Sequence, residues 1–234
     1  APTATAIKDA MALLSSRARR DGDEYQVYTR VAEEGGKIYL DLTNAGRQVV
    51  EIDAYGWRVL DISPVRFKRS ESMKPLPEPR KGNLNTLRDF LNFGPGDDAV
   101  WALYAACLVQ ALRGDSHYPP LVIYGEHGSA KTTAAKMYRR LIDPNKSDLR
   151  SPPKNETDLF IQAMNGQVLG YDNLSGLSPW LSDALCRIST GGGMSTRKLY
   201  TDNGEVIFEG TRPVVLNGIE EIATRSDLMD RAVI

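Results

Sequence analysis

The chain has 234 residues, of which 41% are hydrophobic and 25% are charged, and its formal net charge is −1. This composition is ordinary for a soluble globular protein, and the length suits one large domain or two small ones. Because the bulk charge is close to zero, any contact with nucleic acid must come from a local basic patch. The two cysteines, Cys107 and Cys186, stand far apart in apolar helical contexts, so we expect buried free thiols in a reducing compartment.

The sequence contains no candidate for a membrane or secretion segment. Its most apolar stretch, residues 99–112, is too short to span a bilayer and contains Gln110, so it predicts a buried helix. The N-terminus lacks the apolar core of a secretory signal. We therefore expect a cytoplasmic protein that makes no membrane contact. The chain starts without Met and stops just after an apparent motif, so we also expect it to be a segment of a longer protein.

The first third of the chain predicts a small accessory domain, residues 1–70. Residues 4–20 have the pattern of an amphipathic helix that ends in a basic cluster. Short segments that alternate apolar and polar residues follow, separated by Gly-containing turns, and they predict an antiparallel meander. These segments are 25–32, 37–42, 48–53 and 57–60. Residues 71–83 hold three prolines and predict a linker or an extended strap.

The remaining residues, 84–234, predict an α/β core. Two helices are expected first, and from Leu121 onward short apolar strands alternate with helices. Such alternation favours a parallel sheet with helices on both faces. The expected helices are 84–92, 97–113, 131–142, 156–164 and 179–189, and the expected strands are 121–124, 168–171 and 214–216, with a hairpin at 194–209.

A phosphate-binding loop is predicted directly after the first of these strands. Residues 125–132 read Gly-Glu-His-Gly-Ser-Ala-Lys-Thr, against a template of Gly-x-x-x-x-Gly-Lys-Ser/Thr between a strand and a helix. Backbone N–H groups of such a loop cradle phosphates, Lys131 would reach the β and γ phosphates of ATP, and Thr132 would bind Mg²⁺. Ala130 departs from the template glycine, which is harmless unless a positive φ is required there. The alternative is a Gly-rich turn that only joins two elements. The predicted nucleotide-binding residues are Gly125, Glu126, His127, Gly128, Ser129, Ala130, Lys131, Thr132 and Thr133.

The strand at 168–171 ends in an acid, Asp172. Downstream of a phosphate loop, this residue is expected to hold Mg²⁺ directly or through water, although it could instead cap a turn. Many related ATPases place a glutamate next, as the general base. Here Asn173 follows, and an amide cannot take a proton, so the base stays open and Glu126 is a weak candidate.

Two further features lie near the C-terminal end. The strand at 214–216 leads into Asn217, whose side chain could bind the γ-phosphate or the attacking water, or could simply form an Asn-Gly turn. Arginines follow closely and suggest a finger aimed at the nucleotide of a neighbouring subunit, with Arg231 favoured and Arg225 as the alternate. The alternative is a solvated, charged helix end.

The hairpin at 194–209 carries a candidate DNA contact on its first arm. Arg197 and Lys198 point to opposite sides of a strand, so one of them is expected to face a phosphate. Tyr200 lies on the Lys198 side and could stack on a base. A plain surface hairpin is the alternative.

In order, these motifs resemble AAA+ ATPases, and within them they are most similar to superfamily 3 helicases and to the helicase part of phage and plasmid primase-helicases. The resemblance rests on the loop, the Asp172-Asn173 strand, the hairpin, the Asn217 strand and Leu-Met-Asp-Arg at 228–231, and it covers residues 84–234. It implies an AAA+-like P-loop fold and a hexameric ring that moves on single-stranded DNA with ATP and Mg²⁺. A primase or primase-polymerase partner is also implied, and the C-terminal helical lid of such ATPases is absent from this chain.

Two functions remain open. The first is an ATP-hydrolysing DNA motor, a ring helicase in the replication of a phage, plasmid or integrated mobile element. The second is a P-loop ATPase switch for DNA binding, helicase loading or regulation without unwinding, which the missing glutamate favours. A small-molecule kinase is a third reading, but it would not need an arginine that faces another subunit.

Overall fold

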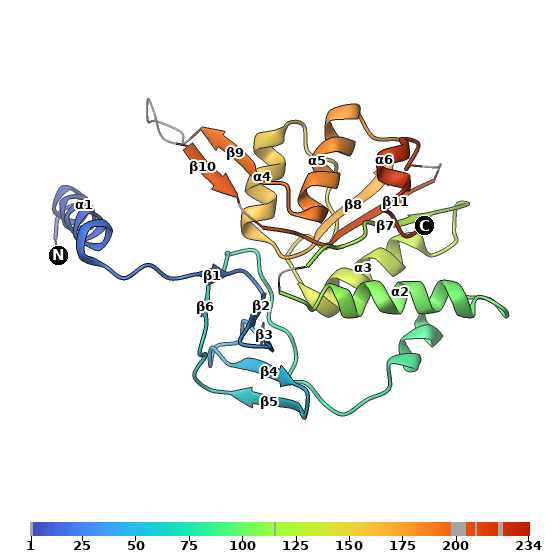
Figure 1. Cartoon of the computed structure of the whole chain (residues 1–234), viewed down its shortest axis with the longest axis horizontal. Coiled ribbons are helices and arrows are strands. Elements are labelled where there is room, and N and C mark those ends of the chain that lie inside the picture. Colours follow the sequence, from blue (N-terminus) through green and yellow to red (C-terminus); the bar gives the residue numbers. More distant parts are fainter. Residues whose placement is uncertain (1, 115, 198–204, 209, 220–221) are drawn as a thin grey trace.

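The structure, a computed structural model, describes residues 2–114, 116–197, 205–208, 210–219 and 222–234. It is an α/β protein with a parallel sheet and a separate antiparallel sheet. Figure 1 shows three parts: a lone N-terminal helix, a small antiparallel unit, and a larger body in which helices cover the parallel sheet. Among the described residues, no helix has both the length and the apolar character needed to cross a membrane.

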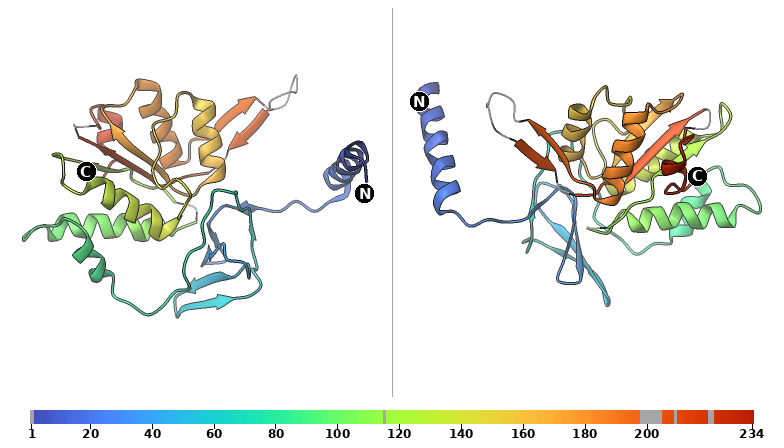
Figure 2. Two further views of the ribbon diagram at one scale, coloured as in Figure 1. Left: turned by 180° about the vertical axis from the view of Figure 1, so that it is seen from behind. Right: turned by 45° about the horizontal axis from the view of Figure 1, so that its top comes forward.

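Helix α1 (Ala4–Asp21) confirms the predicted N-terminal helix. It begins at Thr3, whose Oγ1 accepts a hydrogen bond from the backbone N–H of Ala6 over 3.2 Å. None of its residues is buried, and Figures 1 and 2 show the helix standing away from the rest of the chain. Apolar side chains such as Met11 and Leu14 are therefore exposed.

The antiparallel unit confirms the predicted meander. Its sheet has the order β2-β3-β4-β5, formed by β2 (Val31–Glu34), β3 (Lys37–Asp41), β4 (Val49–Asp53) and β5 (Gly56–Leu60). Gly35 and Gly36, with φ of +61° and +74°, make the turn between β2 and β3.

The predicted strand 25–32 is in fact two strands. Its first half, β1 (Val27–Tyr28), pairs in parallel with β6 (Arg66–Phe67), and only its second half joins the sheet as β2. The break falls at Arg30, whose side chain is fully buried between the two parts of the molecule. The alternation of buried and exposed side chains expected for one strand is therefore interrupted at Arg30, because this charged side chain points into the interior.

A buried ion pair joins the antiparallel unit to the body. Arg30 Nε lies 3.2 Å from Asp143 Oδ1, and both side chains are 0% exposed. Asp143 also accepts hydrogen bonds from the backbone N–H groups of Gln167 and Val168. Burial lowers the pKa of Arg30, and the carboxylate of Asp143 opposes that shift.

Residues 71–83 begin as a strap along this junction. Met73 forms an isolated β-bridge with Asn145, and the N–H of Lys74 donates to the carbonyl of Pro144 over 2.9 Å.

A second contact between the antiparallel unit and the body is made by Gly114. It packs against strand β2 so closely that an added Cβ would lie 2.2 Å from the nitrogen of Glu33. Only glycine allows that approach.

The body is built on three parallel strands in the order β7-β11-β8. These are β7 (Leu121–Tyr124), β8 (Leu169–Leu174) and β11 (Val214–Gly218). The last strand in the sequence is therefore the central one. The connecting helices are α3 (Lys131–Ile142), α4 (Glu156–Asn165) and α5 (Pro179–Thr190), as predicted to within a residue.

Helices cover both faces of this sheet, which confirms the predicted layers. On one face α4, α5 and the short α6 (Ser226–Met229) pack through Leu159, Leu185 and Leu228 against Leu216 and Tyr171. The opposite face has its own core, formed by α3 and α2 (Asp98–Gln110) with Tyr138, Ile142, Tyr104, Leu121 and Val215.

Two of the helix predictions need correction. The helical segment expected at 84–92 is a 3₁₀ helix, η1 (Leu84–Phe90), and ends two residues earlier than predicted. The apolar stretch 99–112 was expected to be a buried helix, but α2 buries only one side, and Val100, Leu103 and Val109 are each about half exposed. Helix α2 packs against α3 on one side and faces solvent on the other. Its apolar composition therefore predicted more buried residues than the structure has.

The predicted hairpin is present as β9 (Met194–Arg197) and β10 (Glu205–Phe208), which pair antiparallel. Figure 1 shows it projecting from the body beside α4. Arg197 pairs in register with Glu205 at the outer end of the described arms. The candidate residues Lys198 and Tyr200 lie outside the described residues.

Cys107 and Cys186 are buried free thiols, as expected, and burial raises the pKa of Cys107 to about 11.

Candidate functional site

The carboxyl edge of the parallel sheet brings the predicted site residues together. All three strands run in the same direction, so the loop after β7, the acid of β8 and the amide of β11 meet at one edge. Because β11 lies between its two neighbours, Asn217 stands between the start of α3 and Asp172. The site is thus assembled from three segments that are far apart in the sequence.

The loop after β7 has a left-handed backbone at three positions. Gly125, Gly128 and Ala130 have φ of +149°, +80° and +62°. Ala130 is the N-cap of α3 and lies in the left-handed helical region, which costs an L-residue with a Cβ roughly 1–2 kcal/mol. A positive φ is therefore required where the template has glycine, and the departure at Ala130 strains the loop.

Lys131 folds back over this loop. Its Nζ donates to the carbonyl of Glu126 and to Ser129 Oγ, the latter over 3.1 Å. Ser129 Oγ in turn donates to the same carbonyl over 2.8 Å. The ammonium group is thus held by two acceptors of the loop, the Glu126 carbonyl and Ser129 Oγ. Phosphate oxygens of a bound ligand could replace these acceptors.

Three polar side chains converge below the loop. Thr132 Oγ1 donates to Asp172 Oδ1 over 3.2 Å, and Asn217 Nδ2 donates to Thr132 Oγ1 over 2.9 Å. Asn217 Nδ2 also contacts Asp172 Oδ1. The amide is only 3% exposed, and its Oδ1 has no hydrogen-bond partner among the described residues. A buried acceptor left unpaired at this edge is available to a ligand or a bound water.

The donor set fits a magnesium ion. Mg²⁺ prefers oxygen ligands at 2.0–2.1 Å in octahedral geometry, in which neighbouring ligand oxygens are about 3 Å apart. The two oxygens of Thr132 and Asp172 are separated by a similar distance, 3.2 Å. Both could therefore serve as adjacent ligands, with the remaining positions filled by phosphate oxygens or water.

These groups open onto a cavity of about 340 Å³. Its walls come from the loop, the start of α3 and the ends of β8 and β11. The lining residues are His127, Gly128, Ser129, Ala130, Lys131, Thr132, Thr133, Asp172, Asn173, Asn217, Gly218 and Ile219. The predicted nucleotide residues Gly125 and Glu126 belong to the same loop but do not line it.

A second, more apolar cavity of about 270 Å³ adjoins the loop. It shares Ser129, Ala130 and Lys131 with the first cavity and continues between α2, β7 and the C-terminal residues. Apolar side chains such as Phe93 and Val233 line it. Sequence reasoning missed this groove, because its walls come from segments that meet only in the folded chain.

The backbone conformation of the residue after Asp172 explains why this residue is an asparagine and not a glutamate. Asn173 has a φ of +56°, and its backbone N–H donates to Asp172 Oδ1 over 2.9 Å. Asparagine tolerates the left-handed region better than glutamate does, so this backbone favours an amide over an acid here. The alternative base, Glu126, is exposed and outside the lining of the cavity.

The two candidate finger arginines do not reach this cavity within the chain. Arg225 pairs with Asp183 over 2.9 Å and with Asp227 over 3.3 Å. Arg231 is exposed just after α6. Neither lines the cavity, so either could act only on the nucleotide of another subunit, and their role stays a prediction.

Residues 84–234 match the family described as actinomycete integrative conjugative element replication protein. The chain belongs to this family. No match was found among curated proteins. The matched segment has the bounds of the predicted core and contains every candidate site residue, whereas the antiparallel unit lies outside it. The predicted role in the replication of a mobile element is therefore confirmed at the level of the family. The family description names replication and does not specify an ATPase or a helicase.

Proposed function

We propose that this replication protein is an Mg²⁺-dependent ATPase that drives movement along single-stranded DNA when the element replicates. One observation carries the proposal. The Lys131 loop, Thr132, Asp172 and Asn217 meet around one cavity at the carboxyl edge of a parallel sheet. A loop that merely joined a strand to a helix would need no such convergence.

Each residue has a role set by its chemistry. Backbone N–H groups of the loop and the first turn of α3 bind phosphate oxygens, and Lys131 neutralises charge on the β and γ phosphates. Thr132 and Asp172 would hold Mg²⁺, which offsets the negative charge that builds up on the phosphates. Asn217, at the centre, orients the γ-phosphate or the attacking water through an amide that is already fixed by two neighbours.

The adjoining apolar cavity supports a nucleotide as the ligand in place of inorganic phosphate. A ligand whose phosphates occupy the loop has its base within reach of a groove that shares Ser129, Ala130 and Lys131 with the phosphate cavity. Apolar walls with a few polar groups at one end are typical of small-molecule sites.

The motor part of the proposal concerns the hairpin β9–β10 and a hexameric ring. The first arm, with Arg197 and its neighbours Lys198 and Tyr200, contacts single-stranded DNA, and Arg231 reaches the nucleotide of the next subunit. Arg225 is the weaker finger because two carboxylates already hold it. A mixture of Arg231→Ala and Lys131→Ala subunits should then regain ATPase activity that neither variant has alone.

The central experiment measures ATP turnover with and without single-stranded DNA, together with strand displacement. Lys131→Ala should abolish turnover while the circular dichroism spectrum stays unchanged. Lys136→Ala, on the same helix but outside the cavity lining, is the matched control and should keep the parent activity. Normal turnover by a pure Lys131→Ala protein would remove the nucleotide assignment.

Asn173 supports a second candidate function. A site without an acid beside Asp172 suits slow hydrolysis, in which bound ATP acts as a switch for DNA binding or helicase loading. The same assays separate the two functions. The switch predicts that ATP changes the affinity for single-stranded DNA with no strand displacement, whereas the motor predicts displacement that stops when Lys131 is replaced.

A further inference from the structure

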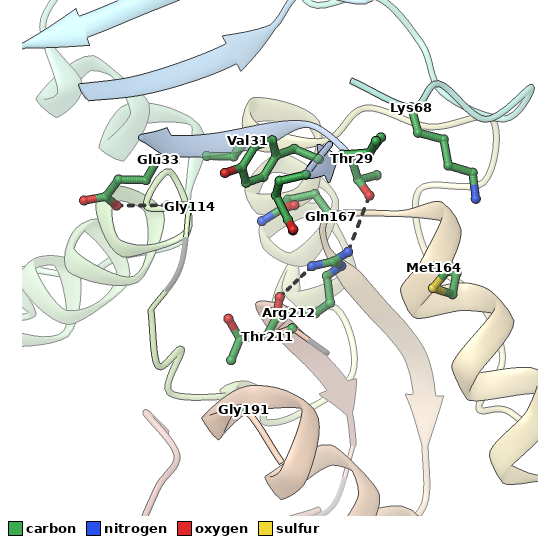
Figure 3. A pocket seen from close by; sticks show the side chains of 14 residues that line it. Thr29, Val31, Glu33, Lys68, Gly114, Met164, Gln167, Gly191, Thr211 and Arg212 are labelled. Atoms are coloured by element: carbon green, nitrogen blue, oxygen red, sulfur yellow. Dashed lines mark hydrogen bonds between the residues drawn. The ribbon is translucent and has the colours of Figure 1, made fainter. Parts of the chain in front are cut away.

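A third cavity, of about 640 Å³, lies between the antiparallel unit and the parallel-sheet body. Figure 3 shows its walls, which come from β1 and β2, from Lys68, from the end of α4 and from the segment just before β11. Gly191 and Gly210, which flank the hairpin β9–β10, also line it. None of the residues assigned to ATP above belongs to this cavity.

Two buried polar side chains in the wall have unpaired atoms. Gln167 Nε2 and Thr211 Oγ1 have no hydrogen-bond partner in the part of the chain that the structure describes. The two residues are only 2% and 5% exposed. Leaving such a group unpaired costs roughly 1–3 kcal/mol, so two of them at one cavity indicate a ligand that supplies their partners. Rotation of the amide presents either its oxygen or its nitrogen, and the hydroxyl can donate.

A buried cation lies between them. The Arg212 guanidinium donates to the carbonyls of Ala163 and Gly166, each over 2.9 Å, and to the carbonyl of Thr211 over 2.8 Å. A longer contact of 3.4 Å reaches Thr29 Oγ1 across the cavity (Figure 3). Burial lowers the pKa of Arg212 to about 10, so the group is still a cation at neutral pH. These contacts fix a positive charge in the wall.

The remaining charges in the lining leave it positive. Lys68 stands at the rim and is exposed. Glu33 is the acid in the lining, but Arg113 binds both of its carboxylate oxygens over 2.8 and 2.6 Å and so compensates its charge. The charge that an incoming ligand meets therefore comes from Arg212 and Lys68.

The surface beside the cavity combines basic and aromatic groups. The Arg66 guanidinium lies 3.6 Å from the centre of the Tyr25 ring, and both residues are exposed. Tyr25 precedes β1, and Arg66 lies on β6, two residues before Lys68. Basic and aromatic side chains in alternation are typical of surfaces that bind single-stranded nucleic acid.

We propose that this cavity binds a phosphate group, carried either by single-stranded DNA or by a free nucleotide. Phosphate oxygens can accept hydrogen bonds from Lys68, Gln167 and Thr211, while Arg212, held by its protein partners, supplies positive charge behind them. Bound phosphate would touch both the antiparallel unit and the root of the hairpin, and would thus connect two parts of the chain. The site goes beyond the proposed ATPase, since it needs neither ATP at the Lys131 loop nor DNA on the hairpin arm.

The test uses the whole chain with Lys131→Ala, which disables the other phosphate site. Binding of a labelled oligothymidylate is followed by fluorescence anisotropy, with inorganic phosphate and thymidine monophosphate as competitors. Gln167→Leu and Thr211→Val should each weaken binding by roughly twofold to tenfold. Lys68→Ala should weaken it and lower the slope of log affinity against log salt by about one. Thr224→Val and Lys81→Ala, two exposed positions outside the cavity, are the matched controls.

Thermal unfolding gives a second readout. Without ligand, Gln167→Leu and Thr211→Val should raise the Tm, because each removes an unpaired buried polar atom. With saturating ligand, the parent should gain more Tm than either variant. Displacement of the oligonucleotide by phosphate and the mononucleotide would assign the site to a free ligand, and resistance to both would assign it to the DNA strand. Absence of binding by every probe, or equal binding by the variants and their controls, would overturn the proposal while leaving the ATPase untouched.

Discussion

Asn217 Nδ2 donates a hydrogen bond to Thr132 Oγ1 over 2.9 Å, although 85 residues separate the two along the chain. The contact ties the end of the central strand β11 to the first turn of α3. Thr132 and Asp172 are both within reach of the same amide, so the position of the predicted metal ligands depends on Asn217.

Replacing Asn217 should therefore impair chemistry more than nucleotide binding. Asn217→Ala removes the amide whose Nδ2 holds Thr132 and Asp172 and whose Oδ1 can accept a hydrogen bond from the attacking water. Loss of one preorganised contact of this kind typically lowers kcat by roughly 10²–10³. The loop and Lys131 still hold ATP, so its Kd should change little. Single-turnover ATPase assays beside a binding titration separate these effects. A parallel loss of affinity and turnover would make Asn217 a binding residue only.

Asp172→Asn should bind ATP but turn it over poorly. The substitution keeps the size and a hydrogen-bonding oxygen but removes the negative charge that Mg²⁺ needs. The dependence of turnover on Mg²⁺ concentration should shift to higher values, which a merely structural residue would not cause. Unfolding of the variant with normal turnover in the folded fraction would instead identify Asp172 as a cap.

Ala130→Gly should stabilise the protein slightly. The left-handed backbone costs Ala130 roughly 1–2 kcal/mol, and glycine would remove this strain. Glycine also makes the unfolded chain more flexible, which offsets about half of that gain, so the free energy of unfolding should rise by about 0.5–1 kcal/mol. Urea unfolding measures the change. Ala134→Gly, inside helix α3, is the control and should lose about 1 kcal/mol. Equal losses in both variants would contradict the strain at Ala130.

Asp143→Ala should destabilise the protein strongly. Removing one partner of a buried ion pair leaves the buried charge of Arg30 without the carboxylate that contacts it, at a cost of about 3–5 kcal/mol. Glu156→Ala, which breaks the exposed pair with Arg187, is the comparison and should cost less than about 1 kcal/mol. Similar losses in the two variants would show that the junction at Arg30 adds nothing to stability.

The sequence by itself determined the local parts of this protein. The strand before the loop, the start of α3 at Lys131, and the places of Asp172 on β8 and Asn217 on β11 all follow from short apolar runs and from turn chemistry between neighbouring residues. These signals are local, which is why the bounds of β7, α3, α4 and α5 were predicted to within a residue. The prediction was less close at the end of β8, which continues to Leu174, and at the end of α2, which stops at Gln110.

Only the tertiary structure decided how these parts meet. The order β7-β11-β8 placed Asn217 between Thr132 and Asp172, and nothing along the chain states which strand is central. Burial of Arg30 against Asp143 broke the first predicted strand in two, overriding its alternating pattern. The cavity beside Gln167 also exists only because distant segments pack together. Burial and strand order depend on contacts between residues far apart in the sequence, and local patterns carry no information about those contacts.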